Sequence, residues 1–173
     1  AQAARAGGNP GDEDDDAPAA ATPAGRDAAL AAFRAREAAI RALAPTLRPM
    51  AVSLYFDEGE RSSSGSGTII TKDGWILTAG HVGGRPGRTV SVRLADGTEL
   101  TGRTAGQMLG PGVDVGLVKA DPAGRDLPFA RLASAEELHP GDTLLVFGHP
   151  LGPELRPWRP PPLRVGMLVG RQD

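Results

Sequence analysis

The sequence predicts an all-β fold of short antiparallel strands, preceded by a helix and a structureless acidic tail. Three observations lead to this prediction. From Met50 onward, apolar residues recur at every second position, as they do along half-buried strands. Asp-Gly pairs at 73–74 and 96–97 separate such runs and are typical of hairpin turns. No run approaches the ~18 consecutive apolar residues of a membrane-spanning helix.

The first 45 residues differ in composition from the rest. Residues 1–26 are rich in Ala, Gly and Pro and contain an acidic run at 12–16, so disorder is predicted. The acidic run could bind a basic partner, but a solvated segment is the favoured interpretation. Residues 27–45 predict a helix that Asp27 caps and Pro45 ends. Its narrow apolar stripe could bind a partner, although packing on its own domain is favoured; the stripe comprises Leu30, Phe33, Ile40 and Leu43.

Residues 46–120 are predicted to form a first β domain. The strands are expected at 50–56, 65–71, 75–78, 88–94, 99–104 and 113–119, with a polar loop at 57–64. Six short strands joined by tight turns are typical of a closed or sandwiched antiparallel domain. A connector at 121–142 follows, and residues 143–173 begin a second β domain that the chain does not complete. Its strands are expected at 143–148 and 164–170, on either side of a Pro-rich loop at 150–162.

Composition excludes several classes of function. The net charge of -2 argues against a general attraction to nucleic acid or anionic membranes. The absence of cysteine excludes disulfides and thiolate metal sites. The chain has no phosphate-binding G-x-x-x-x-G-K loop, no initiating Met and no signal segment, so a fragment or a processed chain is expected.

Two residues are candidates for catalytic chemistry. His81 directly follows the strand expected at 75–78, and a histidine held at a strand exit suits a general base. Asp114 lies within an apolar run, where a carboxylate needs a partner such as an imidazole. The non-catalytic alternatives are an ordinary surface histidine at 81 and a solvated aspartate at the start of a strand at 114. The residues alone leave both alternatives open.

Four segments in order resemble the trypsin-like peptidase fold, and most closely its bacterial HtrA/DegP-like branch. Residues 64–70 (Ser-Gly-Ser-Gly-Thr-Ile-Ile) are similar to the Gly-Ser-Gly strand of that branch. Residues 73–82 (Asp-Gly-Trp-Ile-Leu-Thr-Ala-Gly-His-Val) resemble its Asp-Gly turn and Thr-x-x-His-Val segment. Residues 114–119 (Asp-Val-Gly-Leu-Val-Lys) resemble the segment that carries the catalytic Asp. Residues 141–152 resemble the first strand of the second barrel and the Gly-Asn-Pro-x-Gly that follows it.

The resemblance implies a double β-barrel with the active site between the barrels. His81 would be the general base and Asp114 its orienting partner, in the order His, Asp, Ser. The family's nucleophile lies in a Gly-x-Ser-Gly-Gly segment, which this chain lacks. Ser66 precedes His81 and matches a structural strand, so it is rejected as the nucleophile. The missing serine is attributed to the end of a fragment, which should be inactive alone.

Several residues depart from the family pattern. Gly116 replaces the usual Ala after the Asp, and Gly80 precedes the His; both are small and tolerable. His149 stands where the family usually has Asn and is expected in a loop. A metal site formed by His139, His149 and Asp142 is rejected because the spacing matches no zinc pattern. The loop at 150–162 could bind a partner as a PxxP-like element, but an insertion is favoured.

The function implied for the parent protein is that of a serine endopeptidase acting on peptides or unfolded proteins. It needs no metal, no small-molecule cofactor and no nucleic acid, and the parent could be a homo-oligomer. The resemblance also implies a periplasmic or otherwise extracytoplasmic location. The alternative is a non-catalytic trypsin-fold module that binds proteins. Retention of both His81 and Asp114 argues against that alternative, because a degenerate site needs neither.

Overall fold

A computed structural model describes residues 22–57, 59, 62–149 and 160–170 of the chain. Most of the segment predicted to be disordered, residues 1–21, and most of the Pro-rich loop therefore lie outside the described residues. The chain divides into two units, residues 1–39 and residues 40–173, and each is described by itself. None of the helices in the described ranges is both long and apolar enough to cross a lipid bilayer.

Helix α1 (Pro23–Leu47) is longer at both ends than the sequence predicts. It begins within the segment expected to be disordered, and it continues through Pro45 into a 3-10 turn, η1 (Arg48–Met50). Proline removes one backbone hydrogen bond but adopts a helical φ itself, so a final turn can form around it. The expectation that Pro45 ends the helix is wrong.

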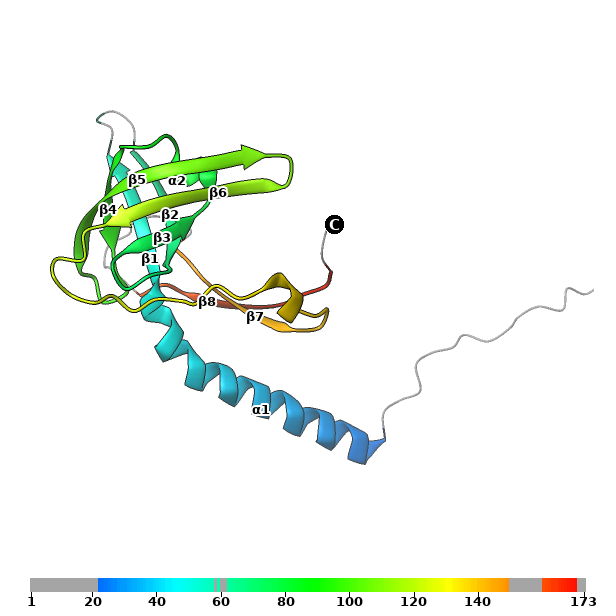
Figure 1. The fold of residues 1–173 in the computed structure, drawn as a ribbon. Coiled ribbons are helices and arrows are strands. Elements are labelled where there is room, and N and C mark those ends of the chain that lie inside the picture. Colours follow the sequence, from blue (N-terminus) through cyan, green and yellow to red (C-terminus); the bar gives the residue numbers. More distant parts are fainter. Residues whose placement is uncertain (1–21, 58, 60–61, 150–159, 171–173) are drawn as a thin grey trace, which may run out of the picture. The chain divides into compact units, whose positions relative to one another are not determined.

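The second unit contains a closed antiparallel barrel in the strand order β1-β2-β3-β6-β5-β4 (Figure 1). The all-β class predicted from the sequence is confirmed. The barrel strands are β1 (Ala51–Asp57), β2 (Ser62–Ile69), β3 (Trp75–Thr78), β4 (Thr89–Arg93), β5 (Glu99–Gly110) and β6 (Val113–Ala120).

The barrel interior is filled by alternating apolar side chains from all six strands. Its fully buried members include Val52, Leu54 and Phe56 of β1. The other side of β1 is buried too, because Ala51 and Ser53 are almost inaccessible. The prediction that only one face of this strand is buried is therefore wrong for the first residues of β1.

Two strands are longer than expected. β2 begins at Ser62, so part of the predicted polar loop is paired with β1. β5 continues past Thr104 to Gly110 through a register shift between Thr104 and Gly106. This bulge extends β5 and β6 into the long hairpin seen in Figure 1. The hairpin matters for the site because its outer part carries Asp114.

The described part of the second domain is one antiparallel pair, β7 (Thr143–Phe147) and β8 (Leu163–Met167). It agrees with the expected start of a second β domain, although β8 ends three residues earlier than predicted. The connector before it contains a single 3-10 turn, η2 (Ala135–Glu137). Several apolar side chains of the pair remain exposed, including Val146, Val165 and Met167.

Candidate active site

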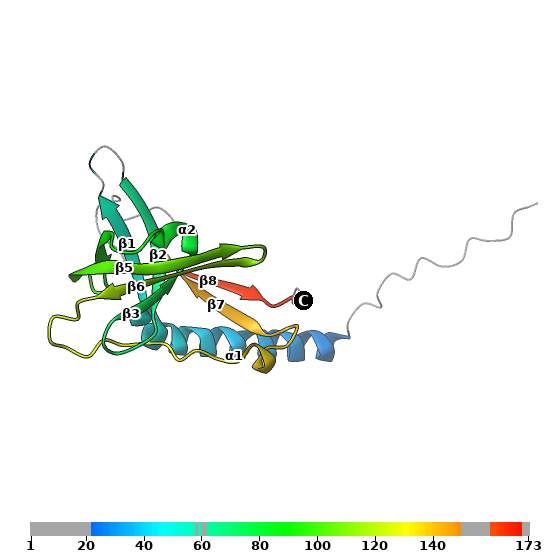
Figure 2. The same cartoon turned by 45° about the horizontal axis from the view of Figure 1, so that its top comes forward.

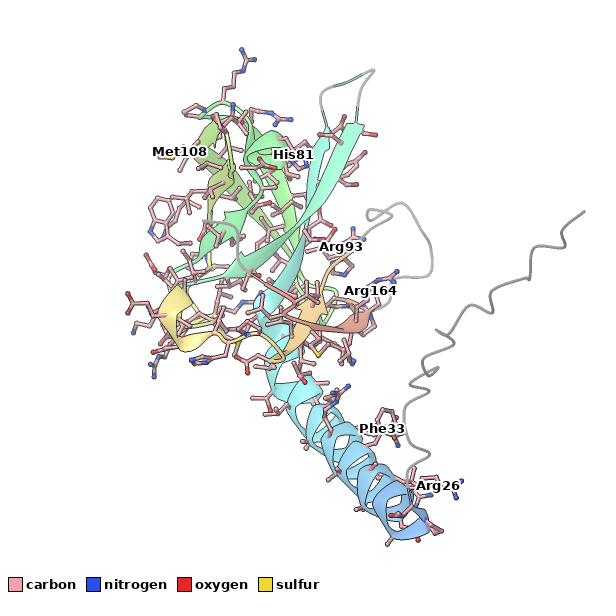
Figure 3. All side chains as sticks on the ribbon, turned by 90° about the vertical axis from the view of Figure 1, so that its right-hand side faces the viewer. Arg26, Phe33, His81, Arg93, Met108 and Arg164 are labelled. Atoms are coloured by element: carbon pink, nitrogen blue, oxygen red, sulfur yellow. The ribbon has the colours of Figure 1, made fainter. Side chains whose placement is uncertain are left out.

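His81 lies in α2 (Gly80–Gly83), a single helical turn that directly follows β3. The sequence places it at a strand exit, and the structure adds that the exit is helical. Figure 2 shows α2 beside β2 and the β5–β6 hairpin. In Figure 3, His81 and Met108 lie at the same end of the barrel, with Arg93 and Arg164 toward the other end.

Asp114 is the second residue of β6. Its side chain is 46% exposed, so of the two positions that the sequence left open for Asp114, the solvated one near the start of a strand is found. The first three residues of β6 are exposed because they pair with Met108, Leu109 and Gly110 in the outer part of the hairpin, where those residues are exposed too. The apolar run that suggested burial becomes core only from Gly116 onward.

The two candidate residues are in direct contact. His81 Nδ1 lies 2.6 Å from Asp114 Oδ2, and the His81 backbone N–H donates to Asp114 Oδ1 at 2.9 Å. The contact between these side chains that the family resemblance implies is therefore present. The backbone bond was not predicted, and it means that one carboxylate orients both the imidazole and the turn that carries it. The His81 side chain is 71% exposed, which leaves its ring open to a reactant.

The electrostatics of Asp114 follow from these bonds. The hydrogen bond from the His81 backbone N–H, followed by the one from its imidazole, lowers the pKa of Asp114 below 3.8. The carboxylate therefore stays charged at neutral pH. It accepts a hydrogen bond from Nδ1–H of the imidazole, and in that tautomer Nε2 is the unprotonated nitrogen.

Small residues allow this close approach. A Cβ on Gly80 would lie 2.9 Å from Asp114 Oδ1 and 2.7 Å from a methyl carbon of Leu109. A Cβ on Gly116 would lie 2.8 Å from the Ala79 carbonyl oxygen. The two departures from the family pattern are thus required here, since either methyl group would push α2 and β6 apart.

Sequence reasoning missed Arg88, which contacts the far end of α2. Its Nη1 donates to the backbone carbonyls of Val82 at 3.3 Å and Gly83 at 3.1 Å. The only sequence signal was a basic residue directly after a Gly-rich turn. Such a signal does not indicate which carbonyls a flexible side chain will reach.

Ser66 and His149 lie in contact at a different place in the second unit. The His149 backbone N–H donates to Ser66 Oγ at 2.7 Å, which gives Ser66 a structural role in this structure. His149 lies in a loop after β7, as predicted, but it is buried there, with 8% of its surface exposed. Burial lowers the pKa of His149 below 6.5, and a hydrogen bond with the Val52 backbone partly opposes this effect.

Comparison with known proteins agrees with this architecture. The family model described as "Trypsin-like peptidase domain" matches residues 65–170, more than half of the chain. Three relatives share the name "Probable periplasmic serine endoprotease DegP-like". The one from Pseudomonas putida is 40% identical over 93 residues, which are 54% of this chain and 18% of the relative.

The other two relatives match the chain at similar identity. The one from Pseudomonas savastanoi pv. phaseolicola is 37% identical over 117 residues, 68% of this chain and 23% of the relative. The one from a Marinomonas species is 37% identical over 95 residues, 55% and 19% of the two chains. The chain thus spans about a fifth of the length of the curated relatives it matches. With a closed first barrel and a family match over more than half of its length, this chain belongs to the trypsin-like peptidase domains and is similar to their DegP-like members.

Proposed function

We propose that the protein containing this chain is a serine endopeptidase in which His81 is the general base and Asp114 orients it. The observation that carries the proposal is the 2.6 Å contact between His81 Nδ1 and Asp114 Oδ2, made by a ring that is otherwise exposed. This arrangement leaves Nε2 available to take a proton from a hydroxyl group. The names of the relatives, which include "serine endoprotease", support the same reaction.

The proposed reaction is acyl transfer. His81 Nε2 accepts the proton of a serine hydroxyl while Oγ attacks the scissile carbonyl carbon, and the imidazolium then protonates the leaving amine. In the second step, His81 Nε2 accepts a proton from water while the water oxygen attacks the acyl carbon, and the imidazolium then returns a proton to the departing serine Oγ. The charged carboxylate of Asp114 stabilises the imidazolium during both steps.

The nucleophile must come from outside these 173 residues, which contain no Gly-x-Ser-Gly-Gly segment. The oxyanion hole is normally built from backbone N–H groups beside that serine. We therefore propose that the 173-residue chain is inactive by itself and contributes half of the catalytic site. The substrate class follows the family and consists of peptides or unfolded proteins.

The cellular location and the oligomeric state of the parent protein are also proposals. The relatives carry "periplasmic" in their names, which supports an extracytoplasmic location for the parent protein. Assembly of the parent into a homo-oligomer remains a prediction from the resemblance.

A serine-reactive fluorophosphonate probe, used together with hydrolysis of a fluorescently labelled unfolded protein, tests the proposal. The parent protein should be labelled and active, and the 173-residue chain should be neither. In the parent, Asp114→Asn should lower kcat by about 10⁴-fold because the tautomer of His81 is wrong, and His81→Ala should lower it by about 10⁶-fold because the proton acceptor is lost. Circular dichroism should show that both variants keep the fold.

The same experiment distinguishes the non-catalytic alternative. A parent protein that binds unfolded substrate but takes up no probe, and whose hydrolysis is absent before any substitution, is a binding module. A substituted serine in the parent at the nucleophile position would have the same meaning.

A further inference from the structure

The one-turn helix α2 cannot hold its own position. A single turn is unstable in isolation, because nucleation costs more than its few hydrogen bonds return. The orientation of His81 therefore depends on what contacts α2. Asp114 accepts the His81 backbone N–H and so contacts the N-terminal end of α2. The Val82 side chain packs over Gly65, where a Cβ would lie 2.5 Å from a Val82 methyl carbon.

The opposite end of α2 is held by Arg88. Its Nη1 donates to the carbonyls of both Val82 and Gly83, which belong to the last residues of the turn. Carbonyls at a helix C-terminus lack intrahelical partners and carry partial negative charge, so a cation is favourable there. The backbone closes around this contact, because Gly84, at φ +67°, approaches so closely that a Cβ would lie 2.7 Å from Arg88 Nη1.

Arg88 is itself anchored in the barrel core. Its guanidinium carbon lies 4.2 Å from the ring centroid of Phe56, which is fully buried. Its backbone N–H donates to Thr104 Oγ1 at 2.9 Å, and its carbonyl accepts from the Thr104 N–H at 3.0 Å. Thr104 is buried on β5. These contacts connect the rigid interior of the barrel to the carbonyl end of the turn that carries His81.

We propose that Arg88 is a positioning residue for His81, which it holds by fastening the carbonyl end of α2 to Phe56 in the barrel core. The inference rests on the proposed function in that it treats the orientation of His81 as catalytic. The contact suits arginine in particular. A planar guanidinium can lie flat on an aromatic ring while its N–H groups reach two carbonyls, and the compact ammonium of lysine cannot do both.

Hydrogen exchange and an NMR titration of the 173-residue chain test the proposal without requiring catalysis. In Arg88→Met, which keeps the apolar stem, the His81 amide should exchange about tenfold faster, the factor expected when one charge-assisted hydrogen bond is weakened. The pKa of Asp114 should rise toward 3.8, since its largest perturbation comes from that same amide. Amides of β1 should keep their wild-type exchange rates. Arg88→Lys should fall between the wild type and Arg88→Met.

Arg85→Met is the matched control, because Arg85 is exposed in the same loop. It should leave both readouts at their wild-type values. The proposal is overturned if Arg88→Met behaves like this control, or if exchange in β1 accelerates as much as exchange at His81, which would indicate a general structural role. If Arg88→Met does not fold, Arg88→Lys decides, and a wild-type exchange rate at His81 then contradicts the proposal.

Kinetics of the parent protein separate this inference from the proposed function. Arg88→Met should lower kcat by about tenfold or more with little change in KM, because misorientation of the base affects the chemical step. A parent without peptidase activity would overturn the proposed function while the exchange and titration results still decide the role of Arg88. An active parent with wild-type kcat in Arg88→Met would overturn the positioning role alone.

Discussion

At the scale of single residues, the carboxylate of Asp114 contacts both the side chain and the main chain of His81. Oδ2 contacts the imidazole of His81, and Oδ1 accepts the backbone N–H of the same residue. The side chain and the main chain of His81 therefore share one anchor. Because the carboxylate is half exposed, its low pKa arises from hydrogen bonds rather than from a buried ion pair.

The first prediction concerns pH. The folded-state pKa of Asp114 is depressed, so its contribution to stability is complete above 3.8 and is lost as the pH falls through the lower folded-state value. The difference in Tm between the wild-type chain and Asp114→Asn should therefore shrink on acidification below pH 3.8. Thermal unfolding followed by circular dichroism across this range measures it. A difference that stays constant with pH would contradict the assignment.

At the scale of elements, glycines determine how closely β2 can approach its neighbours. Gly67 of β2 pairs with Thr78 of β3, and a Cβ at Gly67 would lie 2.5 Å from a methyl carbon of Ile76 and 3.3 Å from one of Val52. Both of these neighbours are fully buried. The second glycine of the Gly-Ser-Gly pattern is therefore a packing requirement of the barrel interior.

The second prediction follows from this contact. Gly67→Ala should lower the free energy of unfolding by about 1–3 kcal/mol, the usual cost of overfilling a packed core. Chemical denaturation of the 173-residue chain measures this change. The control is Gly110→Ala, at the outer end of β5, where a Cβ meets open space and a change within about 0.5 kcal/mol is expected. Equal effects of the two substitutions would refute the packing argument.

At the scale of the second unit, Ser66 and His149 connect the first barrel with the segment that follows β7. His149 donates its backbone N–H to Ser66, and its imidazole lies buried beside the backbone of Val52 in β1. Ser66 of β2 pairs with Ser53 of β1, so these two residues are neighbours in the sheet. Ser53 is buried where His149 contacts Ser66. A titratable ring at this position makes the contact sensitive to pH.

The third prediction tests that sensitivity. Burial depresses the folded-state pKa of His149, so its neutral form supports the fold fully above pH 6.5, and this support is lost as the pH falls from 6.5 through the folded-state value. Asparagine does not titrate. Relative to wild type, His149→Asn should therefore gain stability on acidification below pH 6.5, as measured by Tm. A parallel pH dependence in the two proteins would show that His149 titrates as it does in the unfolded chain.

The sequence by itself determined the β class and most strand positions, and its motifs, through their resemblance to a known family, implied the pairing of His81 with Asp114. These features depend on local patterns: a period of two, turn glycines, and short motifs in a set order. The helix boundary at Pro45, the start of β2 and the length of β5 were predicted wrongly. Each depends on neighbouring strands or turns that a local pattern does not contain.

Only the tertiary structure decided the environment of the candidate residues. The sequence left the burial of Asp114 open and placed His149 in a loop; the structure shows that Asp114 is half exposed and that His149 is buried. Burial depends on which segments cover a residue, and those segments are distant in sequence: Ser66 lies 83 positions from His149. The same reason applies to Arg88. Its chemistry was visible in the sequence, but its role depends on where the fold places the carbonyls of α2 and the ring of Phe56.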